Sequence, residues 1–375
     1  MKYFVRILSA LLILAMAFSL VACSDDEKET KDPDAGTLDL DTGNPSDKDT
    51  DESGEEPSED ESASEGGTVD LNTYEDPTLE APAVKEFTIP TTSPVKIKTV
   101  APTASEDRKT VTVKGELVYT GSLILVNPQN ALKQDPADSL IKLYEHRASS
   151  EGKGKYQLAN AEHTFIHQEA ADAFTSMMIA ANAQNAKCSN IEVSEAYRSA
   201  QQQEDNFIAA NGVNAMKPNH SDFQTGYSMH LKYYDGTYKY PLSGDKNNTD
   251  VAPAGAVIAD LADSYGFIQR YPAGKSDYTG LKDGVMPYLY RYVGVPHARV
   301  MAEGGYCLEE YIEGIKNYTA ANQLSVTDGD HVYHVFYVPA AAEGDTTFEI
   351  PTIYSDSYTV SGNNVDGFIV TVTIS

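Results

Sequence analysis

Apolar residues recur at helical spacing in three stretches of the chain. Between residues 167 and 187 they return every three or four positions, which predicts an amphipathic helix with its apolar stripe in the core. Residues 257–265 predict a second helix, which Gly266 is suited to end. Residues 308–318 predict a third helix with glutamates at its start. The methionines of the first stripe are therefore expected to be core residues rather than ligands.

Alternation of apolar and polar residues predicts β-strands elsewhere. Residues 111–119 alternate as an edge strand would, residues 122–126 are expected to form the first strand of the main domain, and residues 191–194 read as a buried strand. Beyond about residue 326 most of the chain alternates, with turn residues between the runs. These runs are residues 331–338, 347–350, 358–360 and 368–374. We therefore expect a small C-terminal β appendage over residues 326–375.

The N-terminus has the pattern of an export signal over residues 1–22. Lys2 and Arg6 precede an apolar run that is too short and too early for a membrane-spanning helix. The run ends in Leu-Val-Ala-Cys, which resembles a bacterial lipobox and implies acylation of Cys23. The alternative is an ordinary signal peptide followed by a chance cysteine. The pattern predicts a lipoprotein anchored in the membrane at its extracytoplasmic face.

Most of the negative charge lies directly after this signal. The chain of 375 residues has a formal net charge of -28, and residues 24–82 hold 22 Asp or Glu against 3 Lys, a net of -19. This stretch is too polar to bury a core, so residues 23–82 are expected to be a disordered tether. Calcium binding is the alternative interpretation of the acidic run. The acidity argues against a nucleic-acid partner.

The sequence does not decide whether the two further cysteines, Cys188 and Cys307, form a disulfide. A disulfide is permitted outside the cytoplasm, and two buried free thiols fit equally well. Two cysteines by themselves provide no metal framework.

Six short motifs stand in order between about residues 122 and 314. They are residues 126–132 (VNPQNAL), 196–199 (AYRS) with Gln203, 221–226 (SDFQTG), 265–272 (YGFIQRYP) with Lys275 and 279–280 (TG), 287–294 (PYLYRYVG), and 308–311 (LEEY). Together they resemble the VanY-type D-alanyl-D-alanine carboxypeptidases. The resemblance implies the α+β Hedgehog/DD-peptidase fold, a small antiparallel sheet with flanking helices, over residues 122–318. Residues 83–121 would then be a transition segment.

The resemblance also implies where a catalytic zinc ion would be held. The positions of the family's two histidine ligands and one aspartate ligand are Phe223, Leu289 and His230, and the general base is at Met286. Phenyl and isobutyl groups have no lone pair for zinc, and a thioether cannot take a proton from water. We therefore expect no zinc cofactor and no catalytic residue in this chain.

A rearranged metal site is the alternative. His220 and His297 lie near these motifs in sequence and could join His230 as ligands. Both are expected more simply as surface residues.

The residues that the resemblance implies for ligand binding are present in this chain. By resemblance, Arg198 is the arginine that pairs with the terminal carboxylate of the peptide, and its fork suits a carboxylate. Tyr197, Gln203 and Ser221 complete the expected ligand-binding set. The alternative is that Arg198 forms only a structural ion pair. The chain has no Trp, and Tyr288 stands at one of the family's tryptophan positions.

Three functions fit these residues. The first is a binding module that recognises the stem peptide of peptidoglycan, at its D-Ala carboxylate, or another wall component, without cutting it. The second is an active carboxypeptidase with a rearranged metal site. The third is a cell-envelope scaffold that binds a protein partner. The presence of the expected ligand-binding residues favours the binding module.

Overall fold

The computed structural model describes residues 69–71, 73–102 and 107–375. The predicted signal, Cys23 and most of the acidic segment lie outside the described residues. Within them, no helix combines the length and apolar character needed to cross a membrane.

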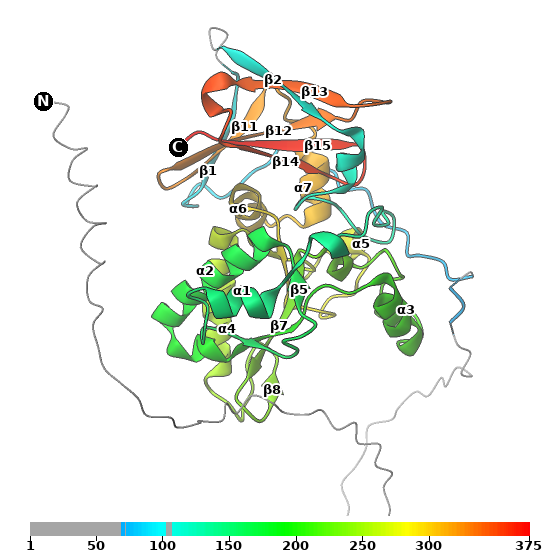
Figure 1. The fold of residues 1–375 in the computed structure, drawn as a ribbon, viewed down its shortest axis with the longest axis vertical. Helices are drawn as coiled ribbons and strands as arrows, with labels where there is room; N and C mark the ends of the chain where they lie inside the picture. The colour runs from blue at the N-terminus through cyan, green and yellow to red at the C-terminus, as the bar shows by residue number, and fades with distance from the viewer. Residues whose placement is uncertain (1–68, 72, 103–106) are drawn as a thin grey trace, which may run out of the picture. The chain divides into compact units, whose positions relative to one another are not determined.

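A six-stranded sheet forms the centre of the main domain (Figure 1). Its strands, in spatial order, are β4 (Gln157–Leu158), β6 (Ile191–Glu195), β7 (Ser228–Tyr234), β10 (Leu289–Tyr292) and β9 (Phe267–Gln269), with β8 (Lys239–Tyr240) paired to β7. All neighbours are antiparallel except β4 and β6. Residues of α2 (Gln168–Gln184) and α4 (Val251–Ala262) share one buried core with the sheet. The buried side of α2 is the stripe predicted from the sequence, so this helix is confirmed.

The part of the chain that the structure describes contains five further α-helices. They are α1 (Leu143–Ser149), α3 (Ala200–Ala209), α5 (Ser276–Thr279), α6 (Val295–Gly304) and α7 (Leu308–Ile315). The start of α3 is fixed by a capping box, in which Ser199 and Gln202 satisfy each other's backbone N–H groups. A short pair of strands, β3 (Ile141–Lys142) and β5 (Phe165–Ile166), leads into α2. The predicted third helix is confirmed as α7, and the second begins at Val251, earlier than predicted.

The C-terminal strands form a second sheet together with strands from the N-terminal side. Its order is β1 (Lys96–Val100), β11 (Gln323–Asp328), β12 (His331–Pro339), β15 (Gly367–Thr373) and β14 (Tyr358–Gly362). A separate pair joins β2 (Arg108–Val113) to β13 (Thr346–Pro351). The segment 83–121 therefore supplies two strands to the β region, and α6 and α7 lie between the two larger sheets (Figure 1).

Two strand predictions are wrong, one at its C-terminal end and the other over its whole length. The edge strand predicted over residues 111–119 stops at Val113, because its partner β13 begins opposite that residue, and residues 115–119 form a 3-10 helix. Residues 122–126 are not a strand, although four of them are buried. The carbonyl groups of Ser122, Ile124 and Val126 accept hydrogen bonds from buried arginines. They are therefore not available to a neighbouring strand.

The disorder predicted to residue 82 extends too far. Residues 73–82, which we call the strap, pack on the main domain. The Tyr74 ring meets Phe207 of α3 edge-on at 4.9 Å, and the Lys217 ammonium pairs with Asp76 at 2.9 Å. Further along, Leu79 is buried. A few apolar contacts thus order the end of a segment whose composition is otherwise typical of disorder.

His297 is buried, which corrects the expectation of a surface residue. Its side chain is 4% exposed. Nδ1 lies 2.6 Å from the Tyr311 hydroxyl of α7 and Nε2 lies 3.0 Å from the Thr371 hydroxyl of β15. Burial lowers the pKa of His297 to about 3. The neutral imidazole therefore joins α6 to α7 and to the second sheet.

This buried histidine predicts a loss of stability in acid. In the unfolded chain His297 gains a proton below about pH 6.5, whereas in the folded chain it resists protonation until about pH 3. His297 should therefore contribute about 1.4 kcal/mol per pH unit to the fall in the free energy of unfolding as the pH drops from 6.5 towards 3. Urea denaturation at several pH values measures this slope. His297→Gln should reduce it, whereas the exposed His163→Gln should not; equal slopes in all three proteins would contradict the prediction.

Cys188 and Cys307 are both buried free thiols, so the structure contains the second of the two alternatives left open above. Burial raises the pKa of the Cys188 thiol to about 11 and also raises that of Cys307. Neither is expected to be reactive at neutral pH.

Candidate active-site cavity

A cavity of about 230 Å³ lies beside α3, the loop that follows it and the segment before β7. Its lining combines polar groups with an apolar floor. The lining residues are Arg198, Gln203, Asn206, Ala210, Asn214, Ala215, Met216, Ser221, Phe223, Tyr271, Leu281 and Met286. Three of the four predicted ligand-binding residues are among them. The fourth, Tyr197, is outside the lining and donates a hydrogen bond to Asp135 at 2.7 Å.

Two of the four positions where the resemblance places zinc ligands and base, Phe223 and Met286, line this cavity, and the other two, Leu289 and His230, adjoin them. Phe223 and Leu289 are both buried in one apolar cluster, and Met286 packs against it. His230 of β7 stands opposite Leu289 in the register of β7 and β10. The cluster also contains Met216, Tyr271 and Leu281.

The side chains at these positions do not fit a catalytic zinc ion. Such an ion needs three protein ligands with lone pairs, and His230 is the only one of the four residues that offers a ligand of this kind. Its Nδ1 is 2.9 Å from the Ser194 hydroxyl, and burial lowers its pKa to about 4, so it is neutral at pH 7.

The histidines considered for a rearranged site are held elsewhere. The Nδ1 of His220 is 2.9 Å from the carbonyl of Asn127, and His297 contacts Tyr311 and Thr371. Over residues 69–71, 73–102 and 107–375, no three His, Cys, Asp or Glu side chains gather in a way that could hold a metal ion.

Arg198 is occupied by protein groups. Its Nε and Nη2 donate to the two carboxylate oxygens of Glu195, and its Nη1 donates to Gln203 at 3.0 Å. The guanidinium carbon lies 4.1 Å from the centre of the Phe223 ring. Gln203 in turn donates to the carbonyl of Met216 at 2.7 Å, which fixes its orientation. The structural ion pair weighed as the alternative for Arg198 is thus present, with a partner that the sequence analysis did not identify.

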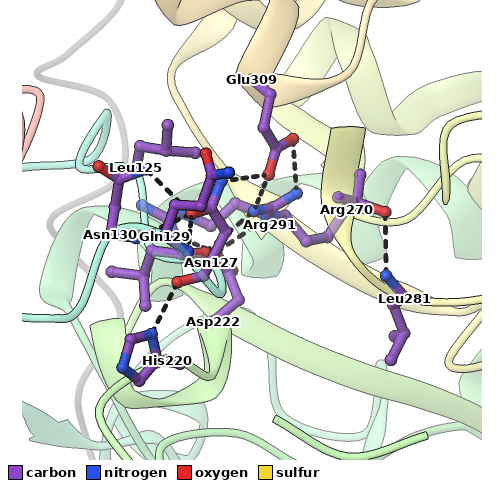
Figure 2. A network of polar contacts seen from close by, with 12 residues as sticks. Leu125, Asn127, Gln129, Asn130, His220, Asp222, Arg270, Leu281, Arg291 and Glu309 are labelled. Carbon is purple, nitrogen blue, oxygen red and sulfur yellow. Dashed lines mark hydrogen bonds and ion pairs between the residues drawn. The ribbon is translucent and has the colours of Figure 1, made fainter. Parts of the chain in front are cut away.

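A buried charge network is centred on Asp222, between the lining residues Ser221 and Phe223 (Figure 2). Asp222 is fully buried, and one of its carboxylate oxygens accepts from Arg270 at 2.9 Å and from Arg291 at 2.8 Å. Arg270 also pairs with Glu309 of α7 at 2.8 Å. Burial alone would raise the pKa of Asp222, but the two arginines outweigh it and hold the pKa below its usual range.

This network explains several motif residues to which the sequence analysis gave no role. Arg270 directly follows β9 and Arg291 lies in the neighbouring strand β10, and both donate to carbonyl groups of residues 122–126. Asn127 donates to Glu309, and its backbone carbonyl contacts His220 (Figure 2). Charged residues inside otherwise apolar motifs are the signal that could have indicated such a network.

A second, larger cavity lies away from these positions. It has about 600 Å³ and is lined by residues of α4, β9 and α6. Its cationic side chains are already paired, Arg299 with Asp263 at 2.7 Å and Lys275 with Glu310 at 2.8 Å. We place the candidate site at the smaller cavity because the predicted ligand-binding residues meet there.

Comparison with known proteins agrees with the family resemblance of the motifs. The sequence profile of the family described as VanY, D-alanyl-D-alanine carboxypeptidase, matches residues 163–295, a range that contains every residue lining the smaller cavity. A D-alanyl-D-alanine carboxypeptidase of Enterococcus faecium is 29% identical over 269 residues, which cover 72% of this chain and 80% of the relative. YodJ of Bacillus subtilis (strain 168) is 31% identical over 204 residues, covering 52% of this chain and 68% of the relative.

Among solved structures, the chain is similar to the vancomycin-resistance D,D-dipeptidase VanXYg in complex with a D-Ala-D-Ala phosphinate analogue. The TM-score is 0.58 at 28% sequence identity, and the alignment covers 71% of this chain and 99% of the other.

Proposed function

Because this chain belongs to the VanY-type D-alanyl-D-alanine carboxypeptidase family, we propose that its main domain binds peptidoglycan stem peptides without cleaving them. The relatives support the ligand class: the Enterococcus faecium protein is named for D-alanyl-D-alanine, and VanXYg was solved with an analogue of that dipeptide. Peptides of this kind are a component of the bacterial cell wall.

One observation carries the non-cleaving half of the proposal. At the positions expected to hold zinc and the general base, Phe223, Leu289 and Met286 pack together in an apolar cluster. Hydrolysis in this family needs a metal-bound water and a group that takes its proton. An apolar cluster supplies neither, and it offers instead a surface on which an alanine methyl group can pack.

The binding half rests on the rim of the cavity. Ser221, Asn206 and Asn214 bring hydroxyl and amide groups to its lining. Each of these groups can both donate and accept a hydrogen bond, as the edge of a peptide requires. A mostly apolar pocket with a few convergent polar groups is the usual form of a small-ligand site.

We also propose that the protein is a lipoprotein held at Cys23 on the extracytoplasmic face of the bacterial membrane. The support is the Leu-Val-Ala-Cys sequence after a charged and then apolar start. This placement would present the cavity to the cell wall. Labelling of the full chain with a radioactive fatty acid tests this proposal. The label should be lost in Cys23→Ser, and absence of label in the wild-type chain would contradict the proposal.

Co-sedimentation with purified peptidoglycan tests the binding function. The full chain should pellet with peptidoglycan, and Ala215→Phe, which fills the lining of the cavity, should raise the apparent Kd about tenfold or more, a loss of at least ~1.4 kcal/mol. Ala209→Phe is the matched control, because Ala209 is exposed on α3 and outside the lining. Absence of pelleting by folded wild-type protein, or equal pelleting by both variants, would contradict the proposed site.

A further inference from the structure

Glu195 and Arg198 form a closed pair at the edge of the cavity. Glu195 is the last residue of β6, and Arg198 follows three residues later, so the turn between them brings the two side chains together. Each of the three guanidinium nitrogens donates to a protein oxygen, two of them to Glu195 and one to Gln203. Arg198 is 8% exposed. A carboxylate of the protein thus occupies the guanidinium group that the resemblance assigns to the carboxylate of a ligand.

The pair leaves the cavity without net positive charge. Arg198 is the only charged residue that lines it, and Glu195 neutralises that charge. Burial lowers the pKa of His230, which stands opposite Leu289 in the sheet, to about 4, so it is neutral at pH 7. A free carboxylate that entered would lose its hydration, and no unpaired cation in the lining would balance its negative charge.

An uncharged amide avoids both costs. A peptide bond or a carboxamide carries no net charge, and its N–H and C=O groups can pair with Ser221, Asn206 and Asn214 in the lining. The apolar side chains of Met216 and Met286 in the lining can contact a methyl side chain. The neutral end therefore keeps the favourable contacts of the cavity.

We infer that Glu195 determines specificity at this cavity, so that it accepts peptide ends in which the terminal carbonyl is an amide and disfavours ends with a free carboxylate. This inference rests on the proposed function and names its ligand more closely. The amide is either a carboxamide or a peptide bond to a further residue, as in a cross-linked stem.

Isothermal titration of the full chain with two synthetic peptides tests the inference. The probes are N-acetyl-L-Lys-D-Ala-D-Ala with a free carboxylate and the same peptide as its C-terminal carboxamide. The wild-type chain should bind the carboxamide about tenfold more tightly or better, because the carboxylate would be buried without a partner charge. Glu195→Gln, which keeps an acceptor for Arg198 but removes the negative charge, should reverse the preference in favour of the carboxylate.

Glu204→Gln is the matched control, because it removes the same charge from α3 at a residue outside the cavity lining. It should keep the wild-type preference, and thermal melting verifies that each variant is folded. A wild-type preference for the carboxylate, or a ratio that is the same in Glu195→Gln and wild type, overturns the role of Glu195 and leaves the binding function standing. If neither peptide binds and peptidoglycan does not pellet the protein, the proposed function itself falls, and the inference with it.

Discussion

The full chain, supplied with Zn²⁺ and a peptide ending in D-Ala-D-Ala, is expected to release no D-alanine above the uncatalysed rate. Phe223 and Leu289 provide no electron pair for the metal, and Met286 provides no base for the attacking water. Because enzymes exceed the uncatalysed rate by roughly 10⁶-fold or more, the assay separates the two outcomes widely. Chromatographic detection of free D-alanine makes the measurement.

The Enterococcus faecium relative, assayed in parallel, is the positive control. Zinc at one equivalent per chain together with D-alanine release would contradict the prediction and establish a rearranged metal site. A gain-of-function variant tests the placement of the four positions: Phe223→His, His230→Asp, Leu289→His and Met286→Glu combined should bind about one zinc ion per folded chain. If it binds none, these positions do not surround the metal site that the resemblance implies.

Asp222→Asn is expected to destabilise the fold by about 3–5 kcal/mol. It removes the negative charge that balances the buried guanidinium groups of Arg270 and Arg291. The free energy of unfolding in urea measures the effect. The same carboxylate should contribute stability at neutral pH that is lost as the pH falls below its ordinary value towards its lowered pKa in the folded state.

Asp260→Asn on the exposed side of α4 is the control, with an expected change within about 0.5 kcal/mol. A loss of less than about 1 kcal/mol in Asp222→Asn would show that Glu309 and the carbonyl groups of residues 122–126 satisfy the arginines without Asp222.

The parts of the fold that could be predicted are those in which a local pattern decides the structure. The spacing of apolar residues predicted α2, and the alternation of apolar and polar residues predicted β6, because a regular local pattern determines which side of each element is buried. Residues 122–126 have an equally apolar pattern, but their carbonyl groups bind Arg270 and Arg291, more than 140 positions away. No local pattern contains that information.

The candidate site also has a part that the sequence could predict and a part that it could not. The motifs placed Phe223, Met286, His230 and Leu289 near one another, and the structure brings them together. The neutralisation of the arginine could not be derived from the motifs, since it depends on the direction of two side chains at the end of β6. The contacts of the strap were missed for a different reason. The composition of residues 23–82 is an average over the whole segment, whereas the strap is held by contacts of individual residues such as Tyr74 and Leu79.

The strap also determines where a mechanical load would enter the folded protein. It contacts α3 through Tyr74 and the following loop through Asp76 and Lys217, and this loop continues into the cavity lining at Asn214 and Ala215. For a chain held at Cys23, a pull along the backbone would reach these contacts before it reached either sheet. Tension between the membrane and the wall would therefore act first on the cavity wall, so the occupancy of the cavity and the stretching of the chain would be coupled.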